Sequence, residues 1–594
     1  MFARALLVLL LVIVAPASAH AATWYVSPSG SGTACTSGTP CGSFSAAYAA
    51  ASPGDVVEVA AGSYGFQSTP EGTRSGPPVV FRESGGDVEV SALDAGGDWT
   101  TFQGFEITTG GVGVVSTIAN NKAIGNRFED VRMVGGLYLQ NTDQTAIIGG
   151  EICCRADTKV INMAGQIGGD PANTANTDVL IDGTDIHTAT RTSGSVHTEC
   201  AFLIAVQGMT IRNTHWWNCA VYNFGIGKIG SDLCPSDILI ENSVFEASDD
   251  ITVGGKQGYY AGYVQSCGVD VQFRNNAFEQ GLELDPTASP EPLVTGNLLY
   301  QGFNCNDATF VHNTMVRGGG ACSGGDDHDN VSIASLADQW IDPANDDYRL
   351  KPTSPAIDAA DPSDAPALDK DGRVRDALPD AGPYEYEPAV AKWALNETSG
   401  TTAADSINGL DGTLTNGAAW TASGKYGGAA TFDGTDDYVN VPDDTLLDLD
   451  TFTLEAWVYP TSLSGSQYRS VIFKEDGANS RQAYSLYASE GASHPTAEVG
   501  DPLSSGVERI IGSQTIAANT WTHIAATYDG TALKVFKNGV EIGAQALTGT
   551  LPTSSSPLRI GGNMIYWNEW FEGHIDEVAV YDRALSAAEI AADM

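Results

Sequence analysis

The sequence predicts an all-β protein in which a parallel β-helix is followed by an antiparallel β-sandwich. A phrase of an apolar residue, any residue, Asn or Gly, two further residues and another apolar residue recurs nine times between Phe102 and Arg317. From about Val390 the sequence pattern changes to longer expected strands, in which apolar and polar residues alternate, and this part of the chain contains no cysteine. Glycine is abundant (67) and charged residues make up only 17% of the 594 residues, which suits turn-rich β folds. A chain of this length also exceeds one hydrophobic core.

The recurring phrase is typical of a solenoid coil, because Asn and Gly tolerate positive φ at a sharp corner between two short strands. Stacked coils bury an apolar face that one coil cannot bury alone. Four consecutive intervals between corners, from Gly149 to Asn275, are the longest, and extra residues in a solenoid often form loops on the binding face. We therefore expect a ligand groove between Gly149 and Asp285. The expected corner residues are Gly104, Gly125, Gly149, Gly183, Asn213, Asn242, Asn275, Gly296 and Asn313.

The first 21 residues have the pattern of a signal peptide. Arg4 supplies a charge, Ala5–Val14 an apolar run, and Ala19-His20-Ala21 a small-x-small cleavage site. We expect a secreted monomer, extracellular or at the cell surface, with no membrane insertion. The formal net charge of −44 argues against nucleic acid and anionic membranes as partners and permits cation binding.

All ten cysteines precede residue 323, and an oxidising compartment would allow them to pair. Aligning the coils on their corner residues predicts Cys234–Cys267 and Cys305–Cys322, because equivalent positions on adjacent coils lie about 4.8 Å apart. Cys35 and Cys41 are expected to close a small loop. The remaining cysteines are Cys153, Cys154, Cys200 and Cys219. A bond between the neighbours Cys153 and Cys154 would be strained, so we expect each of them to bond either Cys200 or Cys219. Free buried thiols are the alternative.

The two ends of the solenoid carry further signals. The sequence TWYVSPSGSG is followed by an Ala-rich helix expected to begin at Ser43 and end at Pro53-Gly54, and then by PGDVVEVAAGSY. Together with the segment Asp347–Pro388, DYRLKPTSPAIDAADPSDAPALDKDGRVRDALPDAGPYEYEP, this order resembles secreted right-handed parallel β-helix proteins of the pectate-lyase architecture. The resemblance implies a solenoid over residues 22–388, with a helical cap and a packed closing segment.

The last part of the chain resembles the laminin-G-like, concanavalin A-like jelly-roll family. The matching stretches are WALNETSGTTAADSINGLDGTL, ATFDGTDDYVNVP, FTLEAWVYP, WTHIAATYDGTALKVFKNGVEI, LRIGGN and FEGHIDEVAVYDRALSAAEI, and Asn538-Gly539 predicts a two-residue hairpin. The resemblance implies a β-sandwich over residues 389–594 that binds glycans or protein ligands, often with structural calcium. The residues matching the family's acidic positions are Asp405, Asn408, Asp433 and Asp576, which we expect to hold calcium; turn capping is the alternative.

Candidate catalytic residues fall in the long coils. Counting from the corner residues places Asp250 and Glu283 side by side on neighbouring coils, with Asp249 as a third carboxylate. Two carboxylates at that spacing either share a cation, such as calcium, or raise the pKa of one of them, although a solvated acidic stripe is the alternative.

Two other groups lie in the same block. His197 and Glu199 share one face of an extended segment and form a candidate acid–base or metal pair, or a polar network that holds a loop. Lys256 lies in a loop with three tyrosines. Pectate-lyase-like enzymes use a basic residue beside calcium, so the resemblance implies that Lys256 or Arg274 is a candidate base; an ordinary surface loop is the alternative.

Two functions follow. The first is a secreted glycan-interacting protein that acts as a polysaccharide lyase or glycoside hydrolase, with the sandwich binding carbohydrate. The second is a non-catalytic extracellular adhesion or surface-binding protein. The fold alone does not choose between them.

Overall fold

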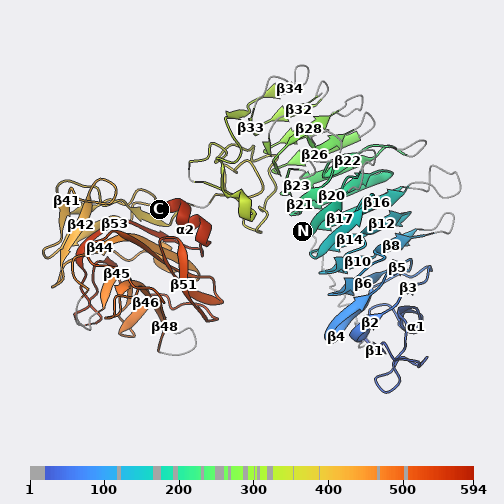
Figure 1. The fold of residues 1–594 in the computed structure, drawn as a ribbon, viewed down its shortest axis with the longest axis horizontal. Coiled ribbons are helices and arrows are strands. Elements are labelled where there is room, and N and C mark those ends of the chain that lie inside the picture. The colour runs from blue at the N-terminus through green and yellow to red at the C-terminus, as the bar shows by residue number, and fades with distance from the viewer. Residues whose placement is uncertain are drawn as a thin grey trace, which may run out of the picture. The chain divides into compact units, whose positions relative to one another are not determined.

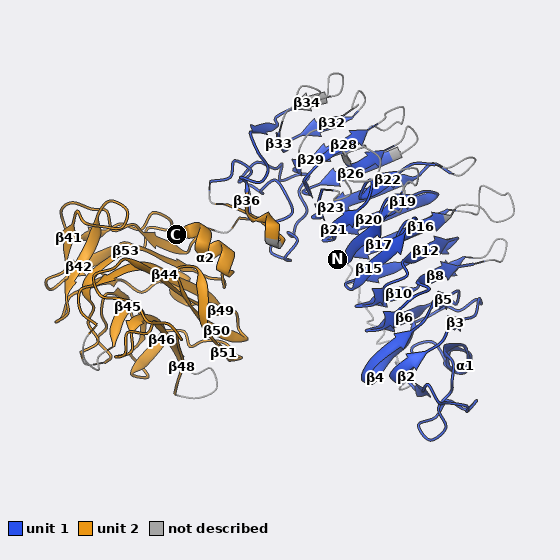
Figure 2. Ribbon diagram, in the orientation of Figure 1, with its two compact units in different colours: residues 1–339, 353–385 blue, residues 340–352, 386–594 orange. Residues whose placement is uncertain are grey.

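The computed structural model describes residues 21–116, 122–164, 175–190, 198–228, 233–247, 260–264, 269–284, 292–299, 302–303, 308–316, 326–351, 353–386, 388–463, 468–500, 506–566 and 568–594. The predicted signal peptide therefore lies outside the described residues except for Ala21. The chain forms two compact units (Figure 2): Met1–Gln339 with Thr353–Glu385, and Trp340–Pro352 with Tyr386–Met594.

The first unit is a parallel β-helix in which each coil contributes strands to three columns (Figure 1). β1 (Thr23–Val26), β2 (Val56–Tyr64) and β4 (Val79–Val90) begin it. The first column continues through β6 (Thr100–Gln103), β10 (Arg127–Glu129), β14 (Ala146–Ile148), β17 (Asn176–Asp182), β20 (Val206–Arg212), β23 (Ser236–Glu241), β26 (Val269–Arg274), β29 (Leu293–Thr295), β32 (Thr309–Val311) and β34 (Asp326–His328), with β9 (Ala123–Ile124) and β13 (Thr142–Asp143) before β10 and β14.

The second and third columns complete the coils, and the predicted fold class is confirmed. The second contains β7 (Glu106–Ile107), β11 (Arg132–Met133), β15 (Glu151–Ala156), β18 (Asp185–Thr190), β21 (His215–Cys219), β24 (Val244–Phe245), β27 (Ala277–Phe278), β30 (Leu298–Leu299), β33 (Thr314–Val316) and β35 (Val331–Ile333). The third contains β3 (Gln67–Thr69), β5 (Leu93–Ala95), β8 (Val112–Val115), β12 (Leu137–Gln140), β16 (Ile161–Ala164), β19 (Ala201–Leu203), β22 (Phe224–Ile226), β25 (Tyr260–Val264), β28 (Gly281–Leu284) and β31 (Gly302–Phe303).

Most of the predicted corner residues form one stack between the first and second columns. All of the following have positive φ there: Gly104, Gly149, Gly183, Asn213, Asn242, Asn275 and Gly296. Gly125 is also a corner residue with positive φ, but it belongs to the preceding corner of its coil, because Ile124 pairs with Asp143.

The ninth corner is displaced by one residue. Thr295 pairs with Val311, so His312 occupies the corner, with φ of +53°. Asn313 instead aligns with Asn297 in the next, inward-facing position. The spacing of apolar residues was the same in either alignment, so only strand pairing distinguished them.

The interior of the solenoid combines aromatic stacks with a polar ladder. Trp216, Phe245 and Phe278 pack on one another on successive coils, with ring centroids 5.5 and 4.8 Å apart. Beside them, buried asparagines bond from coil to coil: Asn276 Nδ2 donates to Asn297 Oδ1 at 3.0 Å, and Asn297 Nδ2 donates to Asn313 Oδ1 at 3.0 Å. These bonds satisfy amides that no water reaches.

The predicted helical cap is confirmed. Helix α1 (Phe44–Ala50) has Ser43 as its N-cap, whose side chain accepts a hydrogen bond from the Ala46 N–H. The ring of Phe44 packs on Phe81, with centroids 5.2 Å apart, and closes the end of the core. A disulfide joins Cys35 and Cys41, as expected.

The pairing of the other cysteines differs from the expectation. Cys153 bonds its neighbour Cys154, and Cys200 bonds Cys219. Cys154 takes a left-handed conformation, with φ of +75°, at a bend that the adjacent coils repeat. The chain bends between Cys153 and Cys154, and the spacing of the cysteines in the sequence does not predict this bend.

The two predicted coil-to-coil disulfides are not seen among the described residues. Cys234 carries a free thiol, so its predicted bond to Cys267 is not formed, although the strand that follows Cys234 keeps the predicted register, with Ser236 opposite Val269. Cys267, Cys305 and Cys322 themselves lie outside the described residues.

The closing segment Thr353–Glu385 packs against the corner stack of the solenoid. Asn242 Nδ2 donates to Leu368 O at 2.6 Å, and Asn275 Nδ2 donates to Asp380 O at 2.7 Å. Arg375 forms a buried ion pair with Glu385 at 2.7 Å and donates to Asn242 Oδ1 at 3.1 Å. The corner asparagines therefore hold this segment.

The second unit is an antiparallel sandwich of two sheets. The first contains β41 (Ala419–Thr421), β42 (Ala429–Asp433), β53 (Glu572–Tyr581), β44 (Phe452–Pro460), β49 (Thr522–Tyr528), β50 (Ala532–Lys537) and β51 (Val540–Ala546), with β38 (Ala391–Trp393) on β53. The second contains β39 (Thr402–Ala403), β40 (Gly412–Thr415), β43 (Tyr438–Val441), β52 (Leu558–Ile560), β45 (Arg469–Asp476), β46 (Arg481–Ser489), β47 (Thr496–Gly500) and β48 (Val507–Ile511), and the 3-10 turn η3 (Thr445–Leu447) follows β43. The predicted hairpin at Asn538-Gly539 joins β50 to β51.

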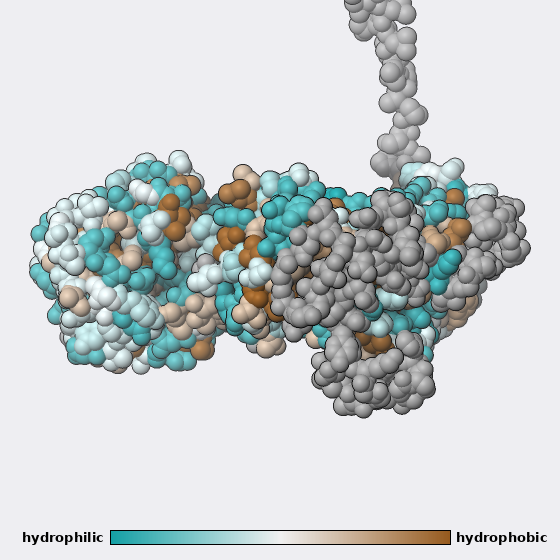
Figure 3. Space-filling view, turned by 90° about the horizontal axis from the view of Figure 1, so that it is seen from above, coloured by the Kyte–Doolittle hydropathy of each residue, from teal (hydrophilic) through white to brown (hydrophobic). Residues whose placement is uncertain are grey.

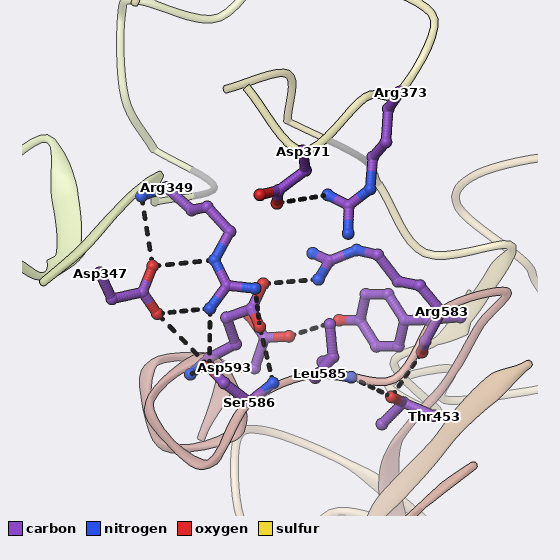
Figure 4. A network of polar contacts seen from close by, with 11 residues as sticks. Asp347, Arg349, Asp371, Arg373, Thr453, Arg583, Leu585, Ser586 and Asp593 are labelled. Carbon is purple, nitrogen blue, oxygen red and sulfur yellow. Dashed lines mark hydrogen bonds and ion pairs between the residues drawn. The ribbon is translucent and has the colours of Figure 1, made fainter. Parts of the chain in front are cut away.

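The second unit also includes Trp340–Pro352, which was expected in the solenoid. This segment forms β36 (Trp340–Asp342), η2 (Pro343–Asn345) and β37 (Asp347–Leu350), and it packs on helix α2 (Ala587–Asp593). Arg349 contacts Asp347 at 2.7 Å and Glu589 at 2.9 Å, and Arg349 Nη2 donates to Ser586 Oγ at 3.1 Å (Figure 4). The contacts of Arg349 with Glu589 and Ser586 join residues far apart in the sequence, and no local pattern predicts them.

Hydrophilic and near-neutral residues cover most of the described surface seen in Figure 3. Within the described part of the chain, no helix has the length and apolar character needed to span a bilayer.

Candidate functional sites

A groove of about 770 Å³ lies in the first unit between the corner stack and the closing segment. Ligand pockets commonly have volumes of about 300–1,000 Å³. The groove falls within the coils where the sequence predicted a binding site. It is lined by Asp182, Gly183, Arg212, Asn213, Glu241, Asn242 and Pro366, Ala367, Leu368, Asp369, Lys370, Asp371 and Gly372.

Charged residues of alternating sign form one wall of this groove. Asp182, Arg212 and Glu241 each come directly before a corner residue and pair in register on successive coils. Arg212 contacts the Asp182 carboxylate at 2.7 Å. Burial raises the pKa of Glu241, although the guanidinium of Arg212 opposes this shift. The wall thus offers both donors and acceptors to a polar ligand.

Lys370, from the closing segment, lines the opposite side. Its Nζ donates to Asn213 O at 2.8 Å. Burial lowers the pKa of Lys370, and the carboxylates of Asp185, Asp371 and Asp182 oppose that shift. Neighbouring Asp369 is occupied structurally, because its Oδ1 accepts the backbone N–H groups of Asp371 and Arg373 at 2.9 and 2.8 Å.

Two histidine–carboxylate pairs flank a tryptophan on the second column. His187 Nε2 contacts Glu151 Oε1 at 2.8 Å, and His215 Nε2 contacts Glu246 Oε1 at 2.7 Å. The ring of Trp217 is nearly parallel to that of His187, with centroids 4.1 Å apart, and lies 4.8 Å from that of His215. The sequence did not predict these partners.

Most of the predicted catalytic residues cannot be placed. Asp249, Asp250, Lys256 and His197 lie outside the described residues. Glu199 is buried and contacts Lys159 at 3.6 Å, which is consistent with a polar network that holds a loop.

The predicted stacking of Asp250 on Glu283 was wrong. Glu283 pairs in register with Tyr263 of β25 on one side and with Phe303 of β31 on the other. The extra residues of this coil come before its third-column strand, so counting forward from the corner residue reached the wrong position.

Two of the four predicted calcium ligands accept several hydrogen bonds from the backbone, as the turn-capping alternative expects. Asp405 accepts backbone N–H groups from Lys392, Ile407, Asn408 and Leu410. Asp576 accepts those of Lys425, Tyr426 and Glu577.

The other two predicted calcium ligands differ from each other. Asn408 Nδ2 donates to Val390 O at 2.9 Å. Asp433 Oδ1 accepts the backbone N–H of Thr435 at 2.8 Å. Its carboxylate also lies with those of Asp436 and Asp437, with one oxygen of each within 4.8 Å of the others.

A cleft of about 450 Å³ lies on the second sheet of the sandwich. Gln482 Nε2 donates to Glu498 Oε2 at 2.7 Å, and Tyr566 Oη donates to Gln482 Oε1 at 3.0 Å. Burial raises the pKa of Glu498 to about 7. The cleft is lined by Glu498, Val507, Glu508, Arg509, Gln545 and Tyr566.

The sequence contains a charge pattern at the solenoid groove that the spacing of apolar residues does not reveal. The residue before the corner is charged in four successive phrases, IDGTDI, IRNTHW, IENSVF and FRNNAF. The sequence pattern at the sandwich cleft is weaker, because its lining residues are spread over β47, β48, β51 and the loop before β53.

Several known proteins are similar to part of this chain. Pappalysin-1 from Mus musculus is 33% identical over 79 residues, which are 12% of this chain and 5% of that protein. Domain 4 of AbnA, an extracellular arabinanase from Geobacillus stearothermophilus solved with arabinotriose, is 22% identical over 34% of this chain and 96% of its own, with a TM-score of 0.26. The binding domain of Paraclostridial Mosquitocidal Protein 1 is 17% identical over 34% of this chain and 51% of its own, with a TM-score of 0.29.

The family match covers most of the sandwich. Residues 433–591 match the family described as the concanavalin A-like lectin/glucanases superfamily. The second unit of this chain therefore contains a laminin-G-like, concanavalin A-like domain, a carbohydrate-binding type of fold that follows a parallel β-helix.

Proposed function

We propose that this protein is a secreted glycan-binding protein and that the sandwich cleft beside Glu498 is its sugar site. The family to which the sandwich belongs includes lectins and glucanases. The disulfides are typical of extracellular proteins. The observation that carries the proposal is a cleft lined by planar polar groups around one aromatic side chain.

The side chains of the cleft suit sugar hydroxyls. Gln545 Nε2 donates to Glu508 Oε2 at 2.8 Å, and Arg509 lies 3.7 Å from the Glu498 carboxylate. These pairs hold fixed donors and acceptors in position before a ligand arrives, which lowers the entropy cost of binding. The ring of Tyr566 supplies an apolar face on which a sugar ring can stack.

A glycan array with the full chain, followed by calorimetry on the best ligand, tests this proposal. Arg509→Gln and Glu508→Gln should each weaken binding at least about tenfold, because each removes a charged hydrogen-bonding group worth about 1.5–3 kcal/mol. Arg82→Gln is the matched control, since Arg82 is an exposed arginine of the solenoid paired with Glu58. Unchanged affinity in both cleft variants would refute the assignment.

A polysaccharide lyase or hydrolase activity in the solenoid is the second candidate. It is favoured by Lys370, a lysine of lowered pKa that lines the groove, because a lowered pKa makes a lysine a better candidate for a general base than an ordinary one. Incubation with uronic-acid polysaccharides, followed by absorbance of unsaturated ends and by reducing sugar, tests it. Lys370→Met should abolish any activity, whereas Lys228→Met, a change at an exposed lysine, should not. An inactive parent protein would leave the adhesion function as the better description.

A further inference from the structure

Three metal-ligating side chains meet on the second column of the solenoid, outside both the groove and the sandwich cleft. One ligand atom from each of Glu151, Cys153 and His187 lies within 4.8 Å of the others. Glu151 and Cys153 come from β15, and His187 comes from β18 on the next coil, directly opposite Cys153. Zinc and related ions bind carboxylate oxygen, thiolate sulfur and imidazole nitrogen at about 2.0–2.3 Å, so one ion fits among three atoms at this separation.

In two of the three side chains, the polar atom that faces away from the site is hydrogen-bonded to another side chain. Arg132 Nε donates to Glu151 Oε2 at 2.7 Å, which leaves Oε1 facing His187. His187 Nδ1 is hydrogen-bonded to Thr188 Oγ1 at 2.7 Å, which leaves Nε2 facing Glu151. Partners of this kind orient metal ligands and fix the histidine tautomer. Trp217 packs flat on the His187 ring and restricts its rotation.

The third ligand is withheld by the disulfide between neighbouring cysteines. Cys153 is fully buried beside His187 and bonded to Cys154, which is exposed. A disulfide sulfur is a poor ligand, whereas a thiolate is a strong one. An external thiol therefore reaches the exposed Cys154 first, and the buried Cys153 is the residue that would bind metal.

We propose that reduction of the Cys153–Cys154 disulfide creates a site for zinc or a similar divalent transition metal. A thiolate of an external dithiol attacks Cys154 Sγ and releases Cys153 as a thiolate; the second thiol of the dithiol then frees Cys154, and the dithiol becomes a disulfide. The metal binds Cys153 Sγ, His187 Nε2 and Glu151 Oε1. It replaces the proton between His187 and Glu151 and leaves a fourth position for water. Thiolate, carboxylate and divalent ion together carry no net charge.

Two variants of the full chain separate this proposal from nonspecific binding. Cys154→Ser and Cys153→Ser both remove the same disulfide and both leave one thiol, but only Cys154→Ser leaves the thiol beside His187. Titration with Co²⁺ should give Cys154→Ser a thiolate-to-metal charge-transfer band and one bound equivalent. Zn²⁺ should compete for that site with an affinity at least about tenfold higher than in Cys153→Ser.

Further titrations test the parent protein and a double variant. The parent should show the band only after a phosphine reductant has cleaved the bond under native conditions, with water supplying the oxygen of the phosphine oxide; this arm replaces Cys154→Ser if that variant does not fold. Adding His187→Ala to Cys154→Ser should remove the band. Equal binding by both single variants, or Co²⁺ binding without a thiolate band, would overturn the proposal, as would an equal band in the untreated parent.

Discussion

Replacing Asn297 by alanine should destabilise the solenoid by about 3–5 kcal/mol. Asn297 is fully buried. Its Oδ1 accepts the backbone N–H of Asn276 at 2.8 Å, and its Nδ2 donates to Phe273 O and Thr295 O, both at 2.9 Å. Stranding the buried Asn276 N–H costs about 1–3 kcal/mol, and each lost hydrogen bond of the Nδ2 group contributes about 1 kcal/mol more.

Asn330→Ala provides the matched control. Asn330 is the partner of Asn313 at the end of the same ladder, and it accepts the backbone N–H of Asn313 at 2.8 Å. It is only partly buried, so water can replace its bonds and the expected cost is about 1 kcal/mol.

Calorimetry of the full chain can measure both variants, because the sandwich transition serves as an internal reference that should not move. A second measurement by urea unfolding converts the shift in the solenoid transition to free energy. A cost below about 1 kcal/mol for Asn297→Ala, or equal costs for the two variants, would refute the view that buried ladder bonds hold the coils in register.

Three further results are expected. Arg375→Met should loosen the closing segment and cost about 3–5 kcal/mol, because it strands buried Glu385; unchanged limited proteolysis of residues 353–385 would contradict this. The raised pKa of Glu498, about 7 in the folded protein, means that the folded state holds a proton that the unfolded state releases near pH 4.5. Sandwich stability should therefore fall by about 3 kcal/mol between pH 4.5 and 7, and Glu498→Gln should flatten that slope in pH-dependent unfolding. Calcium should raise the melting temperature of the sandwich transition relative to a chelator, through Asp433 and its neighbours, and Asp436→Asn should reduce that rise; equal melting temperatures for the parent in calcium and chelator would count against a calcium site.

Much of the fold could be predicted because its signals are local. A corner needs a residue that tolerates positive φ, so Gly183, Asn213 and Asn242 identify their own positions. The Asn538-Gly539 hairpin and the Ser43 cap are short-range chemistry of the same kind.

The sites could not be predicted as well, because they depend on which residues become neighbours across coils. Glu283 faces Tyr263, since a coil can take its extra residues before or after any of its strands. Lys370 reaches the Asn213 carbonyl from a segment 157 residues later in the chain, and Cys153 bonds Cys154 through a left-handed bend.

The sequence by itself determined where this chain turns, which faces of its strands are apolar and where one kind of β structure replaces another. Each of these properties depends on the φ preferences and the apolar alternation of a few consecutive residues. The tertiary structure alone decided the register of the long coils, the pairing of Cys153 with Cys154 and of Cys200 with Cys219, and which residues line the two clefts. Neighbouring strands lie about 4.8 Å apart, whereas the residues they bring together are separated along the chain by loops of variable length, and a shift of one residue there exchanges one side chain at the site for another.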